Sequence, residues 1–552
     1  MAHSIVSVRD DLQQHPELCH STPIPGIERV LSSECLAGEL VHSERTYSPA
    51  EDVITEVAVR PELVVGSGQR GKAYLHRRGQ ALLMTPLNWY RLNERWDLAP
   101  GYHPDDVRRF DRRVREDCVG CHSGHPAVST LRANVFAEPA FHEMRIGCER
   151  CHGPGAGHIA WRRQNGSLNR SVDDPIVNPA SLDTERQEAV CYQCHLSAAA
   201  RVLHAGKRHS DFVPGMLLSE VWGVLDVEVP VSPDQRTKSV RHVQQMRASR
   251  CFVDSEGKLG CISCHNPHRA VDVAEQANFY RARCQSCHTP DACDLPAATR
   301  LERSNDCIAC HMPRLDSSNM EHVVQTDHRI LRKPVADDAG SEEGSGELQF
   351  FAGMDSELTP PARDRSRALG TFVYFDRKGR SLPPNLRSDL ERSLQDFPDD
   401  GLLLEVLGTI ARQEGDVLAA YRYLGRARET REGGEAALHK LLEMTYAVAD
   451  WPNVLAYADE LLAIDPGNVG VLAMRGDARL SLGETDDGIA DVRRAVALHP
   501  TAIPLREWLV RQYERLGRTE DLQAERRIIE QLRQATIPAE FREAAAAADQ
   551  TP

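Results

Sequence analysis

The sequence predicts a mainly α-helical protein with a small β region near its start and an α-solenoid at its end. Three observations predict this fold. Runs rich in Val, Leu and aromatic residues, broken by Gly and Pro, fill 53–92 and are typical of strands. The stretch 104–333 has little apolar periodicity and predicts little regular structure. After it, Pro398, Glu432, Pro466 and Pro500 recur every 34 residues, which is the period of tetratricopeptide (TPR) repeats.

These changes in composition predict domain boundaries. Residues 1–103 hold an irregular polar segment (1–52) and then a small antiparallel sheet, with a turn at Gly66-Ser67-Gly68. The remaining ranges are the central domain (104–333), an acidic linker rich in Gly, Ser and Pro (334–362), a helical lead-in (363–400), the TPR repeats (401–536) and a tail (537–552). We expect poor order in the linker.

The repeat assignment depends on small residues where paired helices approach each other closely. The unit 401–434 has Leu407-Gly408, Ala420 and Ala427, and the unit 469–502 has Gly476. The unit 435–468 matches less well, and 503–536 is degenerate. A generic helical bundle is the alternative. An α-solenoid presents a concave face, so we predict that this region docks a partner protein.

One five-residue pattern, Cys-x-x-Cys-His, occurs six times in the central domain. Its members begin at Cys118, Cys148, Cys191, Cys261, Cys284 and Cys307. This is the attachment signature of c-type haem. Two thiols three residues apart reach the two vinyl groups of one porphyrin, and the adjacent His binds the iron. The predicted attachment residues are Cys118, Cys121, Cys148, Cys151, Cys191, Cys194, Cys261, Cys264, Cys284, Cys287, Cys307 and Cys310.

Zinc is the alternative reading of paired Cys-x-x-Cys elements. A zinc ribbon has no need for His directly after the second Cys, and here that His is present every time. We therefore predict six haem c groups, whose stacked porphyrins replace an ordinary apolar core.

The motifs also predict the proximal iron ligands, which are His122, His152, His195, His265, His288 and His311. A second His on each iron is typical of electron carriers. The leading candidates for that position are His76, His158, His268, His322 and His328. His268 is too close to His265 to reach the opposite face of the same iron, so we expect it to serve a neighbouring haem. The second-rank candidates are His125, His142, His204, His209 and His242.

The net charge and the predicted haem attachment limit the possible functions and cellular locations. With 66 basic and 81 acidic residues the net charge is −15, which argues against nucleic acid binding. No apolar run is long enough to span a membrane. Covalent haem attachment in bacteria takes place outside the cytoplasm, so we predict a periplasmic or otherwise extracytoplasmic protein. Met1–Arg9 lacks the features of a signal peptide, so we expect either a mature form of the protein or a coding sequence that begins upstream.

Four of the 16 cysteines lie outside the motifs: Cys19, Cys35, Cys251 and Cys293. The sequence does not determine whether any of them pair. Cys19-His20 is the second half of a haem motif, so a single-thioether haem is one alternative there, and a free Cys in a loop is the expected state.

Several segments resemble a known family. CERCHGPGAGH, CISCHNPH and DCIACHMPR, followed by HVVQTDH, are similar to the multihaem cytochromes c related to the tetrahaem cytochrome c of ammonia oxidisers. The closest likeness is to the subgroup with C-terminal TPR repeats. Members of this family typically begin with a signal peptide and an additional Cys-x-x-Cys-His. We therefore hypothesise a seventh haem upstream, which an in-frame stop codon before Met1 would contradict.

The resemblance implies electron transfer, with the TPR region holding a redox partner protein. The family includes both carriers and nitrogen-compound oxidoreductases, so whether one haem is also catalytic stays open. The alternative function is an oxidoreductase acting on a small nitrogen or sulfur compound at a five-coordinate haem. An interaction scaffold without redox use is a third reading.

Overall fold

The computed structural model describes residues 5–19, 24–26, 29–92, 94–103, 108–166, 174–227, 241–317, 323–332 and 347–548. The chain divides into two compact units. We call residues 4–145 together with 390–552 the β–repeat unit, and residues 146–389 the central unit. This division groups residues differently from the predicted boundaries at 103, 333 and 400, because the first haem motif falls in the β–repeat unit.

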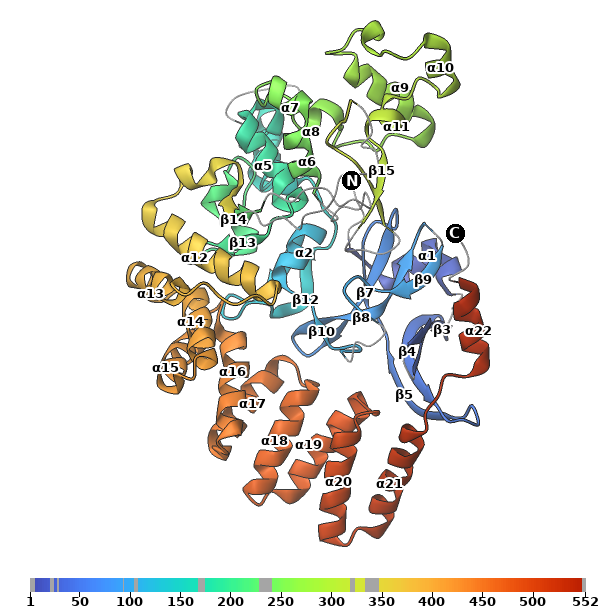
Figure 1. Cartoon of the computed structure of the whole chain (residues 1–552), viewed down its shortest axis with the longest axis vertical. Coiled ribbons are helices and arrows are strands. Elements are labelled where there is room, and N and C mark those ends of the chain that lie inside the picture. The colour runs from blue at the N-terminus through green and yellow to red at the C-terminus, as the bar shows by residue number, and fades with distance from the viewer. Residues whose placement is uncertain are drawn as a thin grey trace. The chain divides into compact units, whose positions relative to one another are not determined.

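Two antiparallel sheets form the start of the β–repeat unit (Figure 1). The first has the order β1-β6-β7-β8-β10, with β9 also paired to β8. Its strands are β1 (Ile5–Ser7), β6 (Leu63–Val65), β7 (Gly71–Arg78), β8 (Ala81–Tyr90), β9 (Arg95–Leu98) and β10 (Arg112–Arg113). The second sheet consists, in order, of β2 (Ile24–Gly26), β3 (Arg29–Leu36), β4 (Glu39–Tyr47) and β5 (Val53–Val59). Helix α1 (Val8–Gln14) follows β1.

The prediction that residues 1–52 are irregular is wrong, because β3 and β4 pair over most of their length. These strands lack the apolar residues that usually indicate a strand, because they bury polar side chains instead. Ser32, Ser43 and Glu44 are all nearly inaccessible, and Ser32 and Ser43 hydrogen-bond each other through their hydroxyls. The turn predicted at Gly66–Gly68 is confirmed, since it joins β6 to β7. Gly66 has a φ of +113°, a conformation that favours glycine.

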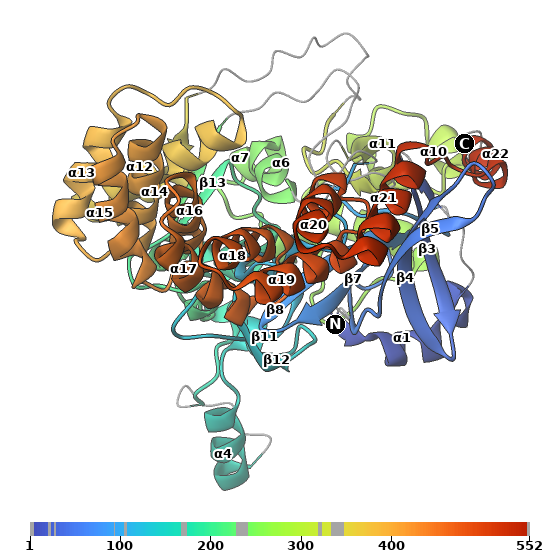
Figure 2. The same cartoon turned by 90° about the horizontal axis from the view of Figure 1, so that it is seen from below.

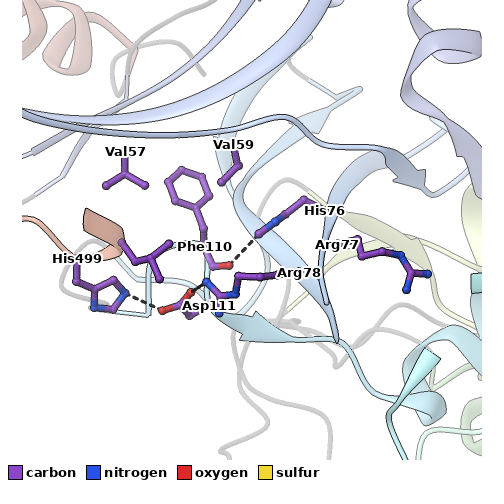
Figure 3. A pocket seen from close by; sticks show the side chains of 9 residues that line it. Val57, Val59, His76, Arg77, Arg78, Phe110, Asp111 and His499 are labelled. Atoms are coloured by element: carbon purple, nitrogen blue, oxygen red, sulfur yellow. Dashed lines mark hydrogen bonds and ion pairs between the residues drawn. The ribbon is translucent and has the colours of Figure 1, made fainter. Parts of the chain in front are cut away.

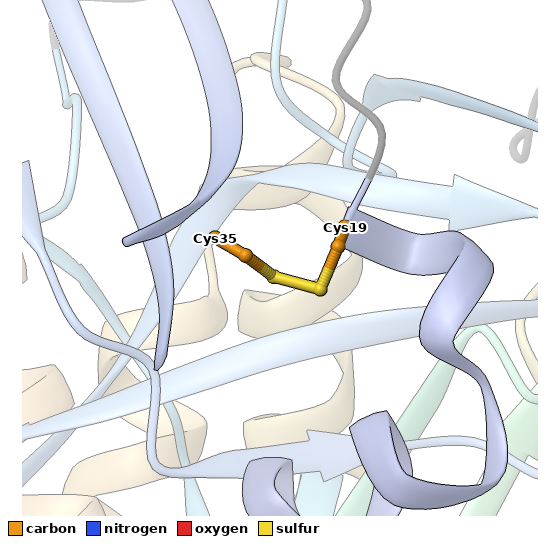
Figure 4. The surroundings of a disulfide bond; sticks show 2 residues. All are labelled: Cys19 and Cys35. Carbon is orange, nitrogen blue, oxygen red and sulfur yellow. A yellow bond between two sulfur atoms is a disulfide. The ribbon is translucent and has the colours of Figure 1, made fainter. Parts of the chain in front are cut away.

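Cys19 and Cys35 form a disulfide in this β region (Figure 4). Cys35 lies on β3, and Cys19 ends a short 3-10 helix, Pro16–Cys19. Both sequence-based readings of Cys19, a free thiol and a single-thioether haem, are therefore wrong. The pairing depends on a tertiary contact between two segments, which sequence spacing does not reveal.

A hairpin of β11 (His125–Val128) and β12 (Phe136–Glu143) completes the β part of this unit. Before it comes the helix of the first haem motif, α2 (Glu116–His122). Val119, inside that motif, packs in an apolar cluster with Leu75 of β7 and Phe136 of β12. This packing explains why the first motif belongs to the β–repeat unit.

Four helix pairs make up the repeat array, and Figures 1 and 2 show them following one another in sequence order. The pairs are α14 (Gly401–Gln413) with α15 (Val417–Arg428), α16 (Gly434–Ala447) with α17 (Trp451–Ile464), α18 (Val469–Ser481) with α19 (Thr485–Leu498), and α20 (Ile503–Leu516) with α21 (Thr519–Arg533). The weak second repeat and the degenerate last one form complete pairs. A Cβ at Gly408 would lie 2.6 Å from Leu424 Cγ, so close helix contact requires glycine there. Helix α22 (Ala539–Ala548) follows in the tail.

The central unit contains one small conventional core. Strands β13 (Ala200–Leu203), β14 (Trp222–Asp226) and β17 (Gln349–Phe350) form an antiparallel sheet. Helix α12 (Pro360–Arg377) packs on it, and buried Arg365 donates a hydrogen bond to the Leu203 carbonyl at 2.7 Å.

Part of the predicted linker is ordered. Residues 349–357 form β17 and a 3-10 helix, and buried Phe350 and Met354 hold them in place. Residues 333–346 of the linker region lie outside the described residues. Helix α13 (Leu386–Asp396) precedes the first repeat, so the predicted lead-in is helical.

The rest of the central unit consists mainly of short helices. Around the last three motifs these are α8 (Cys261–Cys264), α9 (Val273–Cys284), α10 (Ala297–Glu302) and α11 (Cys307–His311). None of these four helices has a buried residue, and Val273 and Leu301 are 85% and 69% exposed. Within the described ranges, no helix is both long and apolar enough to cross a membrane.

Candidate haem-attachment sites

Each of the six motifs lies in a helical turn. The motif helices not yet named are α3 (Glu149–His152) and α5 (Thr184–His195). In the second, fourth and fifth motifs the His N–H donates to the carbonyl of the first Cys at 2.9 Å, which closes one α-turn. Residues i, i+3 and i+4 of a helix share one face, so both thiols and the imidazole face the same side. None of the 12 motif cysteines is in a disulfide, and none is buried.

His152, the proximal candidate of the second motif, lies opposite His268. Their ring centroids are 5.9 Å apart and the rings are 6° from parallel. His152 Nδ1 donates to the Val177 carbonyl at 2.8 Å, which leaves Nε2 as the free nitrogen. A ligand imidazole is commonly oriented by such a bond from its other nitrogen.

The spacing between these rings fits an iron ion between them. An imidazole nitrogen lies about 1 Å from its ring centroid, so centroids about 6 Å apart leave about 4 Å between facing nitrogens. If the two free nitrogens face each other, that gap is too long for a hydrogen bond and equals two metal–nitrogen bonds of about 2 Å each.

The third and fourth motifs also have a second imidazole at a similar distance, with interplanar angles of 80° and 28°. His195 has its ring 6.1 Å from that of His242, and His265 has its ring 6.2 Å from that of His328. His328 Nδ1 donates to the Thr326 carbonyl at 2.7 Å, so its Nε2 is free in the same sense. Burial lowers the pKa of His195, His265 and His328, which favours the neutral form that binds metals.

These two histidine pairs are neighbours. The rings of His242 and His328 are 4.8 Å apart, edge to face. The motif helices are also linked, because Glu188 of α5 accepts the N–H of Cys261 at 2.9 Å. A Cβ at Gly260 would lie 2.3 Å from the Glu188 carboxylate, so a larger residue there would displace the Glu188 side chain. The third and fourth attachment sites therefore lie side by side.

Sequence reasoning ranked His242 below His328. No local pattern distinguishes His242, because it begins a short helix, α6 (His242–Ala248), remote in sequence from the third motif. Its position opposite His195 depends on the tertiary fold. Another pair of second-rank candidates, His125 and His142, also has ring centroids 6.0 Å apart. They lie on the hairpin after the first motif.

The other leading candidates have different surroundings. His158 donates from Nδ1 to Asp174 at 2.6 Å, and Arg162 pairs with the same carboxylate at 2.7 Å. This leaves His158 Nε2 available, with a carboxylate orienting the ring. His311 has the corresponding bond, from Nδ1 to the Leu331 carbonyl at 2.8 Å. His322 lies outside the described residues.

His76 differs from these histidines because its Nε2 is already engaged. It bonds the Phe110 carbonyl at 3.0 Å, beside a cavity of about 130 Å³ that Val57, Val59, Asp111 and His499 help to line (Figure 3). His76 is 7% exposed on β7, and burial lowers its pKa. These contacts favour a structural role for His76 over iron ligation.

The arrangement of the motifs and the histidine pairs is compatible with haem. Haem c attachment uses a pair of thiols, and an iron with two histidine ligands needs one imidazole on each side. The motif cysteines and the three histidine pairs offer these groups. In the described part of the chain, no cluster of three or more His, Cys, Asp or Glu side chains is placed to hold a metal ion by itself.

Comparison with known proteins agrees with the motifs. The family model for cytochrome c554 and c-prime matches residues 103–153, which contain the first two motifs. The multiheme cytochrome MtrA of Shewanella baltica (strain OS185) is 22% identical over 230 residues, which is 40% of this chain and 59% of MtrA. The chain thus matches less than two thirds of that relative.

Two solved structures of MamA also match about a third of this chain. MamA AMB-1 has 17% identity and a TM-score of 0.29, covering 33% of this chain and 96% of MamA. MamA 41-end from Desulfovibrio magneticus RS-1 has 15% identity and a TM-score of 0.27, covering 34% of this chain and 98% of that one. The two sequence matches, with the six motifs, support a multihaem cytochrome c.

Proposed function

We propose that this protein is an extracytoplasmic multihaem c-type cytochrome that carries electrons along closely spaced, covalently bound haems. The observation that carries the proposal is the set of three motif histidines, each with a second imidazole at iron-spanning distance. In this proposal the six motifs attach six haems, and His122, His152, His195, His265, His288 and His311 are the proximal ligands.

The second axial ligands follow from the pairs. His268 is the second ligand of the iron bound by His152. His242 has this role for the iron bound by His195, and His328 for the iron bound by His265. His158 and His322 are the candidates for the remaining irons, together with the second-rank histidines. His76 would first have to release the Phe110 carbonyl.

The residues around the paired histidines suit electron transfer. Each haem, when bound, supplies a one-electron redox centre. Two His ligands fill both axial positions, so no substrate can bind at that iron and the change of charge needs little rearrangement. Backbone carbonyls hold the rings of His152, His311 and His328 in fixed orientations. The contact between His242 and His328 places two ligand sets next to each other, which favours rapid transfer between them.

The disulfide and the repeat array support the rest of the proposal. Disulfides persist outside the cytoplasm, where haem attachment also takes place, so the Cys19–Cys35 bond supports an extracytoplasmic location. Helix-pair arrays of this kind bind other proteins, and we propose that this one docks a redox partner. MtrA, by its name a multiheme cytochrome, supports the same class of function.

The test is a haem count combined with the spin state. The full chain, exported with a haem-attachment system, is expected to show the mass of six attached haems in intact mass spectrometry. Its oxidised spectrum is expected to be low-spin for at least the haems of His152, His195 and His265. A mass without haem would overturn the proposal, and an entirely high-spin spectrum would overturn the axial ligand pairs.

A further inference from the structure

One position recurs in the loops that connect successive repeats. Arg431, Asp465 and His499 are each 34 residues apart, so they occupy equivalent places in three repeats. Each pairs with a charged residue of the amino-terminal part of the same unit. Arg431 lies 2.6 Å from Glu116, Asp465 is 2.6 Å from Arg78, and His499 is 2.7 Å from Asp111. Arg431 and Asp465 each face a side chain of opposite charge, and His499 faces a carboxylate.

These contacts hold one edge of the array against the β region. Arg78 binds Asp465 with two nitrogens, at 2.6 and 2.9 Å. The turn after β7 fits closely there, because a Cβ at Gly79 would lie 2.5 Å from Pro466 Cδ. Gln80 N–H donates to the Ile464 carbonyl at 2.9 Å. This edge of the array is therefore bound within the unit, and an external partner must use another surface of the repeats.

The first of the three pairs involves the helix of the first haem motif. Glu116 is the first residue of α2, two residues before Cys118, and is 4% exposed. Its carboxylate accepts the Asn134 N–H at 2.9 Å, and its own N–H donates to the Asn134 side chain at 3.0 Å. The start of the attachment helix is thus fixed by a reciprocal pair of bonds, and Arg431 completes the set.

Arg431 is built into this place by more than one bond. Its Nη2 donates to Glu116 at 2.6 Å and its Nε to the Ser129 carbonyl at 3.0 Å. Its own carbonyl accepts the Ala133 N–H at 3.0 Å. Arg431 and Glu116 side chains are 11% and 6% exposed. A charge pair this well shielded from water interacts strongly, and removing Arg431 leaves the buried Glu116 carboxylate uncompensated, whereas removing Glu116 leaves Arg431 with Glu432 at 3.4 Å.

We propose that Arg431 of the repeat array is a positioning residue for the first haem, acting through Glu116. It orients the attachment helix and offsets the carboxylate charge beside it. The inference rests on haem attachment at the first motif, which belongs to the proposed function. It gives the array a second role, in which one repeat loop sets the environment of one redox centre.

The electrostatics of the pair predict shifts of opposite sign. Arg431→Met leaves a negative charge near the haem, which stabilises the oxidised iron and lowers its reduction potential. Glu116→Gln leaves a positive charge, which raises that potential, and Arg431 keeps its charge at any accessible pH. The double variant removes both charges and is expected to return towards the wild-type value.

The experiment is a potentiometric titration of the exported full chain, after intact mass has confirmed six haems. In the titration curve, the first haem is identified as the redox component that is missing from the Cys118→Ala/Cys121→Ala variant. Arg412→Met is the matched control, because Arg412 forms an exposed pair with Glu443 at 2.6 Å in the same array. We expect only the first component to move, downwards in Arg431→Met and upwards in Glu116→Gln, with no change in the control. Arg431→Lys keeps the positive charge and is expected to leave the potential of the first haem close to the wild-type value.

The outcomes separate this inference from the proposed function. Single variants that leave the first component in place, or move it in the same direction, overturn the positioning role. If Arg431→Met does not fold, the Glu116→Gln variant is the test. An unchanged reduction potential of the first haem in that variant overturns the inference. A wild-type chain without six haems contradicts the proposed function instead.

Discussion

The rings of His152 and His268 lie 6° from parallel, with centroids 5.9 Å apart, although one histidine belongs to the second motif and the other follows the fourth. His268 comes three residues after His265, so it cannot reach the far face of the iron bound by that histidine. The fold brings it instead to a different motif. The two chain segments are therefore tied together by one iron in the proposed assembly.

Replacing His268 tests this pair. We expect His268→Ala to leave one haem five-coordinate and high-spin while all six haems stay attached, because attachment depends on the cysteines. Carbon monoxide binding to the reduced protein counts the open irons, and we expect one more than in the wild type. His439→Ala is the control, since His439 lies on α16 of the repeat array and is not a candidate ligand. Equal carbon monoxide binding by both variants would contradict the pair.

The adjacent ligands His242 and His328 offer a second test. Their rings touch, yet they face different proximal histidines, His195 and His265. We therefore expect His242→Ala and His328→Ala each to open one iron, and the double variant to open two. Electron paramagnetic resonance would follow the two low-spin signals separately. If the double variant opened only one iron, both histidines would belong to the same haem.

The sequence predicted these sites unevenly, for a physical reason. Attachment residues are local, since two cysteines and a histidine within five residues form the whole motif. The second axial ligand is brought in by the fold, so spacing along the chain carries little information about it. His268 could be assigned to a neighbouring haem only because it lies too close to its own motif. Nothing in the sequence distinguished His242.

The fold shows the same contrast. The repeats could be predicted because close helix packing demands small residues such as Gly408 and Gly476 at a fixed period. The strands before residue 53 could not, because β3 and β4 bury Ser32, Ser43 and Glu44 where a simple pattern expects apolar side chains. The Cys19–Cys35 pairing likewise depends on the sheet, and so does the position of the first motif in the β–repeat unit.

Removing the disulfide is expected to destabilise the β region without affecting haem attachment. Cys19 and Cys35 are 16 residues apart in sequence. Closing a loop of that length removes conformational entropy from the unfolded chain worth about 3 kcal/mol. We expect the Cys19→Ser/Cys35→Ser variant to lose roughly this free energy of unfolding in denaturant titration, with an unchanged haem mass. Loss of a haem in this variant would show that Cys19 also takes part in attachment.

The buried His42 predicts how the stability of the β region depends on pH. His42 is inaccessible on β4, its Nδ1 bonds Thr85 Oγ1 at 3.0 Å, and its ring packs against Tyr74 and Trp96. Burial, with a smaller contribution from nearby His76, lowers the pKa of His42 from 6.5 to about 3. The folded protein therefore keeps His42 neutral down to that pH, whereas the unfolded chain takes up a proton below 6.5.

The sign follows from proton binding. Between those two pKa values the unfolded state binds more protons, so acid favours unfolding. The contribution of His42 is fully present above pH 6.5 and declines as the pH falls towards 3, by about 1.4 kcal/mol per pH unit. His42→Phe keeps an aromatic ring against Tyr74 and Trp96 and cannot titrate. We expect its unfolding free energy, measured in urea from pH 4.5 to 6.5, to depend less steeply on pH than that of the wild type. Parallel pH profiles for the two proteins would show that His42 is protonated, or reached by water, in the folded state.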